Sequence, residues 1–183
     1  MESEELRKYI RPSKSYLIIA VVVTVAVLAY VVVSLVSPAT KFNLAPVIVG
    51  GIISAIFYYV GISLGKDYRR LFSEHSKQEM DDICTEFSSA KPWFSDRIRA
   101  GETMIFMKKD PKLTPYGEIV NVHEFVHKTN GVEDRRALRV KKKDGTVSDL
   151  CQILPRGKSA DEVMRFYMFL HEKNPSTTFG YKK

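Results

Sequence analysis

Residues 15–37 read SYLIIAVVVTVAVLAYVVVSLVS, and residues 44–65 read LAPVIVGGIISAIFYYVGISLG. Neither stretch contains Asp, Glu, Lys or Arg. Because a helix rises about 1.5 Å per residue, roughly 20 apolar residues cross the roughly 30 Å hydrocarbon core of a membrane. The sequence therefore predicts two transmembrane helices, at 15–37 and at 44–65, and this pair decides the architecture of the chain.

The segment between these helices, residues 38–43, is short, so the helices must be antiparallel neighbours in a hairpin. Lys and Arg next to a membrane-spanning helix resist translocation. Four of them lie in residues 1–14 and three in residues 66–70, whereas the connection has only Lys41. We therefore expect a multi-pass protein of the cell membrane, with 38–43 as an external loop and both termini, including a tail at 1–14, in the cytoplasm.

A cleaved signal peptide is the alternative interpretation of the first apolar stretch. Ser37-Pro38-Ala39 offers the small residues that such a cleavage site needs. The stretch is, however, longer than the roughly 7–15 apolar residues of a signal peptide, which favours a retained helix.

Small residues four positions apart mark one face of the second helix. They are Gly51 with Ala55, and Gly61 with Gly65. Small side chains let a second helix approach closely. We expect this face to pack on the first transmembrane helix, and self-association into a homo-oligomer through it is the alternative.

The remaining residues, 66–183, suffice for one compact domain. Apolar residues spaced three and four apart predict a juxtamembrane amphipathic helix over 66–90, which Pro92 ends because proline disfavours helix at the residue before it. Cys84 and Cys151 are too few for a disulfide framework, and we expect both to behave as small buried hydrophobic side chains.

The pattern changes after residue 90 to one typical of strands. Apolar or Val-rich runs lie at 103–107, 118–128 and 137–141, and the dipeptides Asn130-Gly131 and Asp144-Gly145 are typical of type I′ hairpin turns. The two turns together predict a three-stranded antiparallel β meander that ends near Leu154.

The last predicted element is a helix. Ser159 followed three residues later by Glu162 forms a capping-box pattern, and Pro175 ends the helix. The fold class that results is α+β: a transmembrane helical hairpin, then a cytoplasmic domain over 91–176 with an antiparallel meander and a C-terminal helix, and a tail over 177–183.

The densest basic cluster comprises Arg139, Lys141, Lys142 and Lys143. Such charge is attracted to an anionic inner leaflet by about 1 kcal/mol per residue close to the surface. We expect these residues to form a membrane or ligand surface, and a solvated hairpin is the alternative. No pattern of aromatic and basic residues typical of nucleic-acid binding accompanies them, so nucleic acid is not an expected partner.

One motif suggests catalysis: residues 123–127 match H-E-x-x-H, the zinc-protease signature. On a helix, His123 and His127 share one zinc and Glu124 acts as general base. On a strand the two histidines lie about 13 Å apart, too far for one zinc.

The Val-rich run and the Asn130-Gly131 turn favour a strand here, and no third zinc ligand is apparent. We therefore expect no metal, no cofactor and no catalytic residue. A membrane-bound zinc metalloprotease that uses His123, Glu124 and His127 is the alternative.

An antiparallel meander closed by a C-terminal helix, after a transmembrane hairpin, resembles the bacterial pleckstrin-homology-like domains of small membrane proteins. The residues that carry the resemblance are Ile105-Phe106, 114–119, 138–145 and the helix from Ser159, although few residues before Gly101 are left for further strands. The resemblance implies a non-catalytic binding or scaffolding module at the membrane. Its ligand would be a lipid head group, a peptide or a partner membrane protein.

Overall fold

The computed structural model describes residues 2–36, 43–153 and 160–180. The expected loop at 38–43 except Asn43, the capping residue Ser159 and the last three residues lie outside this part. The chain divides into two compact units, one formed by residues 12–71 and the other by residues 1–11 together with 72–183.

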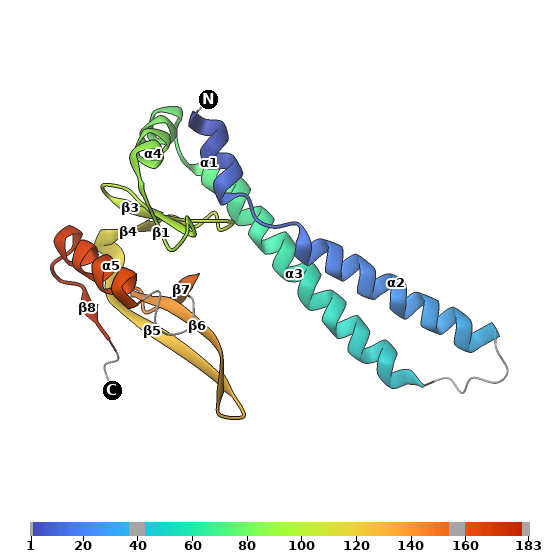
Figure 1. The fold of residues 1–183 in the computed structure, drawn as a ribbon. Coiled ribbons are helices and arrows are strands. Elements are labelled where there is room, and N and C mark those ends of the chain that lie inside the picture. Colours follow the sequence, from blue (N-terminus) through green and yellow to red (C-terminus); the bar gives the residue numbers. More distant parts are fainter. Residues whose placement is uncertain (1, 37–42, 154–159, 181–183) are drawn as a thin grey trace. The chain divides into compact units, whose positions relative to one another are not determined.

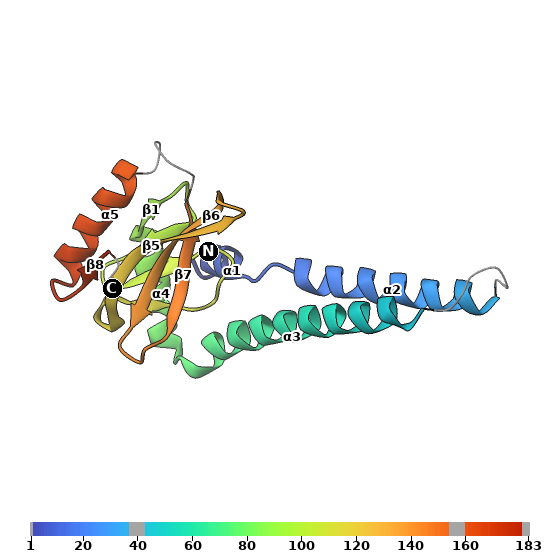
Figure 2. The same ribbon diagram turned by 90° about the horizontal axis from the view of Figure 1, so that it is seen from below.

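The first unit is a pair of helices. Helix α2 (Ser15–Val36) and helix α3 (Leu44–Glu74) are both long and apolar enough to cross a membrane, and they run side by side (Figure 2). The Thr24 hydroxyl donates to Ser54 Oγ at 3.0 Å, and Ser54 donates to the Ala20 carbonyl at 3.3 Å. This small polar network fixes the two helices against each other.

The helices approach closely at Gly50 and Gly61. A Cβ atom added at Gly50 would lie 2.3 Å from Val27 Cγ2, and one at Gly61 would lie 2.7 Å from Leu17 Cδ2. A Cβ at Gly51 or Gly65 would meet no described residue within 4 Å, so these two predicted packing residues do not face α2. Gly61 is one of the residues predicted for this face, whereas the other close approach is at Gly50, one residue and about 100° around the helix from the predicted Gly51.

The expected single helix at 66–90 is divided in two. Helix α3 ends at Glu74, and helix α4 (Lys77–Ser89) begins after the N-cap Ser76. The Glu79 carboxylate accepts from the Ser76 backbone N–H at 2.7 Å, and the Ser76 hydroxyl accepts from the Glu79 N–H at 3.3 Å. This reciprocal capping box starts a new helix, because it satisfies backbone donors that a continuous helix would have bonded internally.

The N-terminal segment is folded. Helix α1 (Glu2–Ile10) buries Leu6 and Ile10 completely, and its Tyr9 ring lies 5.1 Å from the ring of Phe87 in α4. The spacing of Leu6, Tyr9 and Ile10 is that of one helix face. Residues 2–10 therefore belong to the second unit, where the sequence analysis expects a tail.

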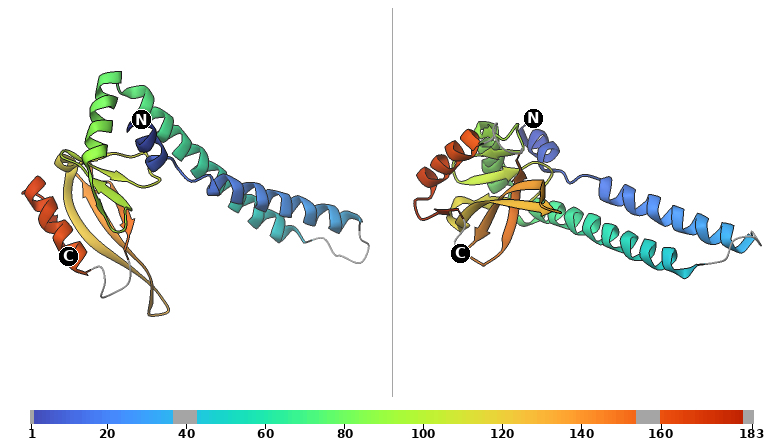
Figure 3. Two further views of the ribbon diagram at one scale, coloured as in Figure 1. Left: turned by 45° about the horizontal axis from the view of Figure 1, so that its top comes forward. Right: turned by 60° about the horizontal axis from the view of Figure 1, so that its bottom comes forward.

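Two four-stranded sheets form the β part of this unit (Figures 1 and 3). The first sheet, entirely antiparallel, consists of β1 (Lys91–Trp93), β2 (Ile98–Ala100), β3 (Met104–Met107) and β4 (Thr114–Pro115), in that order. A 3-10 turn, η1 (Tyr116–Glu118), leads into the second sheet. That sheet has the order β7 (Val147–Gln152), β6 (Val132–Lys142), β5 (Ile119–Thr129) and β8 (Thr178–Phe179), and only the β5–β8 pair is parallel.

The predicted meander corresponds to β5, β6 and β7. Asn130 and Gly131 both have positive φ, 52° and 80°, as the type I′ prediction requires. The second turn differs: only Gly145 has positive φ, 83°, and its N–H donates to the Lys142 carbonyl at 3.0 Å. The prediction of a type I′ turn there is wrong, because this geometry is a type I turn followed by a glycine bulge.

Helix α5 (Ala160–Lys173) closes the fold, which confirms the α+β class. Alternate residues of β3 point to opposite faces of the first sheet. Ile105 packs in a core with Phe166 of α5, whereas Phe106 contacts Phe87 of α4 at 5.3 Å. The first sheet is therefore covered on one face by the second sheet and α5, and on the other by α1 and α4.

Candidate functional site

The H-E-x-x-H segment lies on strand β5. His123 Nδ1 is 2.9 Å from Asn121 Oδ1, His127 Nδ1 is 2.7 Å from Asp134 Oδ1, and the Glu124 carboxylate accepts from Arg136 at 2.9 Å. The three motif residues thus have separate partners. Among the described residues, no three His, Cys, Asp or Glu side chains gather as metal ligands. The helical geometry that the zinc-protease motif requires is not what this segment adopts.

The predicted basic cluster does not form one patch. Arg139 donates to Asp149 at 2.5 Å, and its guanidinium lies 3.5 Å from the Phe125 ring centre. Lys142 pairs with Glu118 at 3.2 Å. Because successive residues of a strand point to opposite faces, Lys142 lies on the face of β6 opposite to Arg139. Lys141 and Lys143 remain exposed.

A different basic site is formed where β2, β3 and β7 end. It is a pocket of about 520 Å³ whose lining comprises Arg97, Lys108, Lys109, Leu150, Cys151 and Gln152. Arg97 donates to the Gln152 carbonyl, which fixes the guanidinium at the pocket wall. None of the described residues that line the pocket is acidic. The pocket therefore presents three cations to whatever enters it.

The turn between β1 and β2 positions this site. Phe94, Ser95 and Asp96 all have positive φ, from 52° to 61°, which is unusual for residues with a side chain. The turn directs Asp96 toward Arg99 at 2.7 Å and Lys108 at 3.4 Å. Burial raises the pKa of Asp96, but the hydrogen bonds and charges of Arg99 and Lys108 outweigh it and lower the pKa overall. Asp96 therefore stays ionised and holds Lys108 at the rim.

Cys151 lines the pocket but adds no reactive group to it. Burial raises the pKa of its thiol to about 12, despite the nearby Arg97. The nucleophilic form of cysteine is the thiolate, so this thiol is unreactive at neutral pH. The expectation that Cys84 and Cys151 are buried is confirmed.

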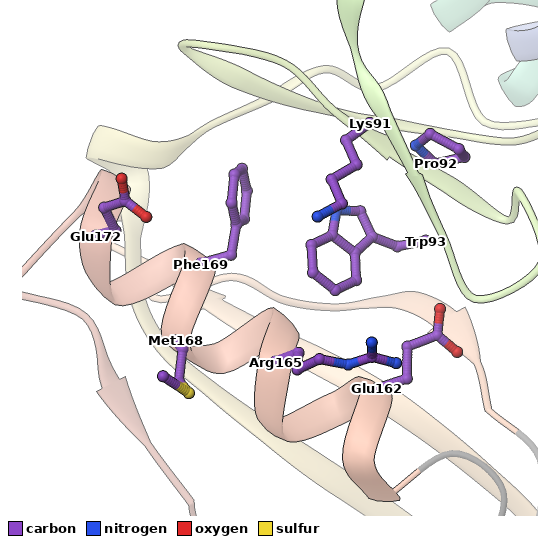
Figure 4. A pocket seen from close by; sticks show the side chains of 8 residues that line it. All are labelled: Lys91, Pro92, Trp93, Glu162, Arg165, Met168, Phe169 and Glu172. Carbon is purple, nitrogen blue, oxygen red and sulfur yellow. The ribbon is translucent and has the colours of Figure 1, made fainter.

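A second concave site lies between β1 and α5 (Figure 4). It is a groove of about 510 Å³ whose lining comprises Lys91, Pro92 and Trp93 of β1 and Glu162, Arg165, Met168, Phe169 and Glu172 of α5. Trp93 forms its floor and packs against Phe166 at 5.2 Å and Phe169 at 5.6 Å between ring centres. Lys91 places its ammonium 4.7 Å from the centre of the indole.

Neither of these two sites was predicted from the sequence. The run Lys108-Lys109 followed by Lys112 is a visible signal for the first one, but it is weaker than the cluster at 139–143. The second combines residues 91–93 with residues 162–172, and only the tertiary fold brings these together.

Comparisons of the chain with protein-family models, with curated proteins and with solved structures find no match.

Proposed function

We propose that this protein is a membrane-anchored, non-catalytic binding module of the pleckstrin-homology-like type. In this proposal α2 and α3 cross the cell membrane, and both termini lie in the cytoplasm. The strand order supports the likeness: β1 to β4 form one antiparallel sheet, β5 to β7 form the meander of the other, and a helix follows. The short strands β1 and β2 lie before Gly101, where the sequence leaves few residues for further strands, and they add to this likeness.

The ligand we propose is the anionic phosphate of a lipid head group, bound at the pocket of Arg97, Lys108 and Lys109. The observation that carries this is the concentration of three cations around one cavity, with no acidic side chain among the described residues of its lining. Arg binds phosphate through its planar fork, and Lys binds it as a point charge. Arg139 and Lys142 of the hairpin cluster pair with carboxylates on opposite faces of β6, so they are poorer candidates for holding one phosphate together.

The pocket is hydrogen bonded to α1, which lies just before the apolar helix α2 in the sequence, and this link along the chain supports a lipid ligand. The Lys109 N–H is hydrogen bonded to the carbonyl of Tyr9 in α1. Only residues 11–14, which include Arg11 and Lys14, separate α1 from α2 in the sequence. In a chain anchored as proposed, these additional cations would also favour an anionic leaflet, by about 1 kcal/mol each near its surface.

The test is hydrogen exchange on the full chain in nanodiscs of neutral or anionic lipid. We expect anionic lipid to protect the amides of residues 97 and 107–109, and a Lys108→Gln, Lys109→Gln variant to lose this protection. The matched control is Lys141→Gln with Lys143→Gln, which removes two exposed charges on the β6–β7 hairpin. Protection that is equal in neutral lipid, or that is lost only in the control variant, would refute the assignment of the pocket.

A further inference from the structure

Trp93 is the only tryptophan of the chain, and its indole N–H is unsatisfied. The side chain is 6% exposed, and Nε1 is buried without a hydrogen-bond partner among the described residues. A buried donor without an acceptor is destabilising, and buried indole N–H groups usually find an acceptor. Because Trp93 lines the groove between β1 and α5, an acceptor that enters this groove would remove the penalty.

Two cations line the groove together with this indole. In Figure 4 the indole lies between the side chains of Lys91 and Arg165. Lys91 is exposed and rests on the ring without an ion pair in the described part of the chain. Within the part of the chain that the structure describes, Arg165 makes only a 3.4 Å hydrogen bond to the Asp161 carbonyl of its own helix. An acceptor between two cations is most favourable when it is negatively charged, which indicates a carboxylate.

The free edge of β1 lacks the backbone donors that pairing with an added strand would need. Pro92 has no N–H, so it must face away from β2, and residues 90 and 94 face the same way because strand residues alternate. The Ala90 N–H already donates to Phe87 at 3.2 Å, and the Phe94 N–H donates to Glu162 at 2.6 Å. With these three positions unable to donate, recognition in the groove must rely on side chains.

The rest of the groove adds an apolar surface and limits the charge of the ligand. Met168 is 67% exposed and lies next to Phe169 in the lining. Exposed methionine side chains adapt to ligands of different shape. Glu162 and Glu172 at the rim would repel a run of acidic residues. The groove therefore fits one carboxylate between apolar neighbours.

We propose that this groove binds a peptide segment of a partner protein in which a single Asp or Glu lies between apolar side chains. Lys91 moves off the indole, the carboxylate accepts from Trp93 Nε1 and pairs with Lys91 and Arg165, and the apolar neighbours pack on Met168 and Phe169. This site is separate from the phosphate pocket, and its assignment does not depend on the lipid ligand.

The experiment uses the full chain in nanodiscs of neutral lipid, where one tryptophan gives one indole N–H resonance in a proton–nitrogen NMR spectrum. The probes are two pools of capped pentapeptides with apolar residues around a central Glu or a central Gln. We expect the Glu pool to move the indole resonance downfield. The Gln pool should need a concentration about tenfold higher for the same shift, because a hydrogen bond to a charged group is stronger than one to a neutral group.

Two variants and a control sharpen the test. Lys91→Gln and Arg165→Gln should each weaken the response to the Glu pool about tenfold, whereas Lys143→Gln on the distant hairpin should leave it unchanged. Equal responses to the two pools, or no response to either, would overturn the proposal. A shift caused by protein concentration alone would assign the groove to a second copy, and a shift caused only by anionic lipid would assign it to the membrane surface.

Discussion

The backbone N–H of Lys109 donates to the carbonyl oxygen of Tyr9 at 2.8 Å and so ties the loop after β3 to helix α1. Lys109 has a φ of 64°, in the left-handed region that residues with side chains rarely adopt. The phenol of Tyr9 in turn donates to the Asp96 carbonyl at 3.2 Å. Helix α1 is therefore bonded to both loops that position the basic pocket, through the end of a segment that the sequence suggests is a tail.

Helix α1 should be needed for the stability of the second unit. Leu6 is completely buried, so Leu6→Ala should lower the free energy of unfolding by about 2–5 kcal/mol. The measurement is the urea midpoint of the full chain in detergent, followed by the emission of Trp93, which lies in the core of this unit. Lys8→Ala, at an exposed position of the same helix, should change the free energy by less than about 0.5 kcal/mol. Equal midpoints for both variants would show that α1 is dispensable.

The start of α4 should depend on Ser76. Ser76→Ala removes the hydroxyl that accepts from the Glu79 N–H, and it should cost about 1 kcal/mol in the same urea measurement. Ser76→Asp keeps an acceptor at the N-cap, so its midpoint should stay close to that of the unchanged protein. If the Asp variant is destabilised as much as the Ala variant, the cap does not set the helix boundary.

The sequence predicts the elements that strong local patterns encode. The two apolar helices, the Asn130-Gly131 turn and the strand at 119–129 follow from composition, turn chemistry and Val content. The break at Ser76 was missed, although S-x-x-E is present, because apolar spacing continues on both sides of it. The short strands β1 and β2 have only three residues each, and pairing with neighbours rather than local propensity makes them strands.

The candidate sites were less predictable than the fold. Charge density selects the cluster at 139–143, but sequence alone does not reveal that Asp149 and Glu118 pair with two of its members. The groove joins Trp93 to Arg165, which are far apart in the chain. No periodic pattern in the sequence predicts that these residues lie together, because they meet only when α5 packs on the first sheet.

Substitution of two adjacent glycines of α3 should have different effects on stability, because only Gly50 packs closely on α2. Gly50→Leu must displace Val27, since a Cβ atom there would already lie 2.3 Å from Val27 Cγ2. Overpacking of this kind costs about 1–3 kcal/mol, so the helix pair should melt at a lower temperature in detergent, as followed by circular dichroism. Gly51→Leu is the matched control and should melt like the unchanged protein, because its Cβ meets no atom within 4 Å. The reverse order of the two variants would support the face with Gly51 that the sequence suggests.

Acid should destabilise the second unit partly through His123. Burial, and then the charge of Arg139, lower the pKa of this imidazole below its ordinary value of about 6.5. At neutral pH the side chain is uncharged in both the folded and the unfolded chain, so it contributes no difference. As the pH falls below about 6.5, the unfolded chain binds a proton that the folded chain takes up only at lower pH, and the free energy of unfolding decreases.

The measurement is the urea midpoint as a function of pH, from about pH 7.5 to about pH 5 around the ordinary histidine pKa. His123→Gln should show a smaller loss over this range than the unchanged protein, because it removes one group that binds protons preferentially in the unfolded chain. Arg139→Gln keeps the imidazole but removes the positive charge that opposes its protonation, so it should also reduce the loss. A loss of the same size in all three proteins would mean that His123 binds its proton equally well in the folded and unfolded chain.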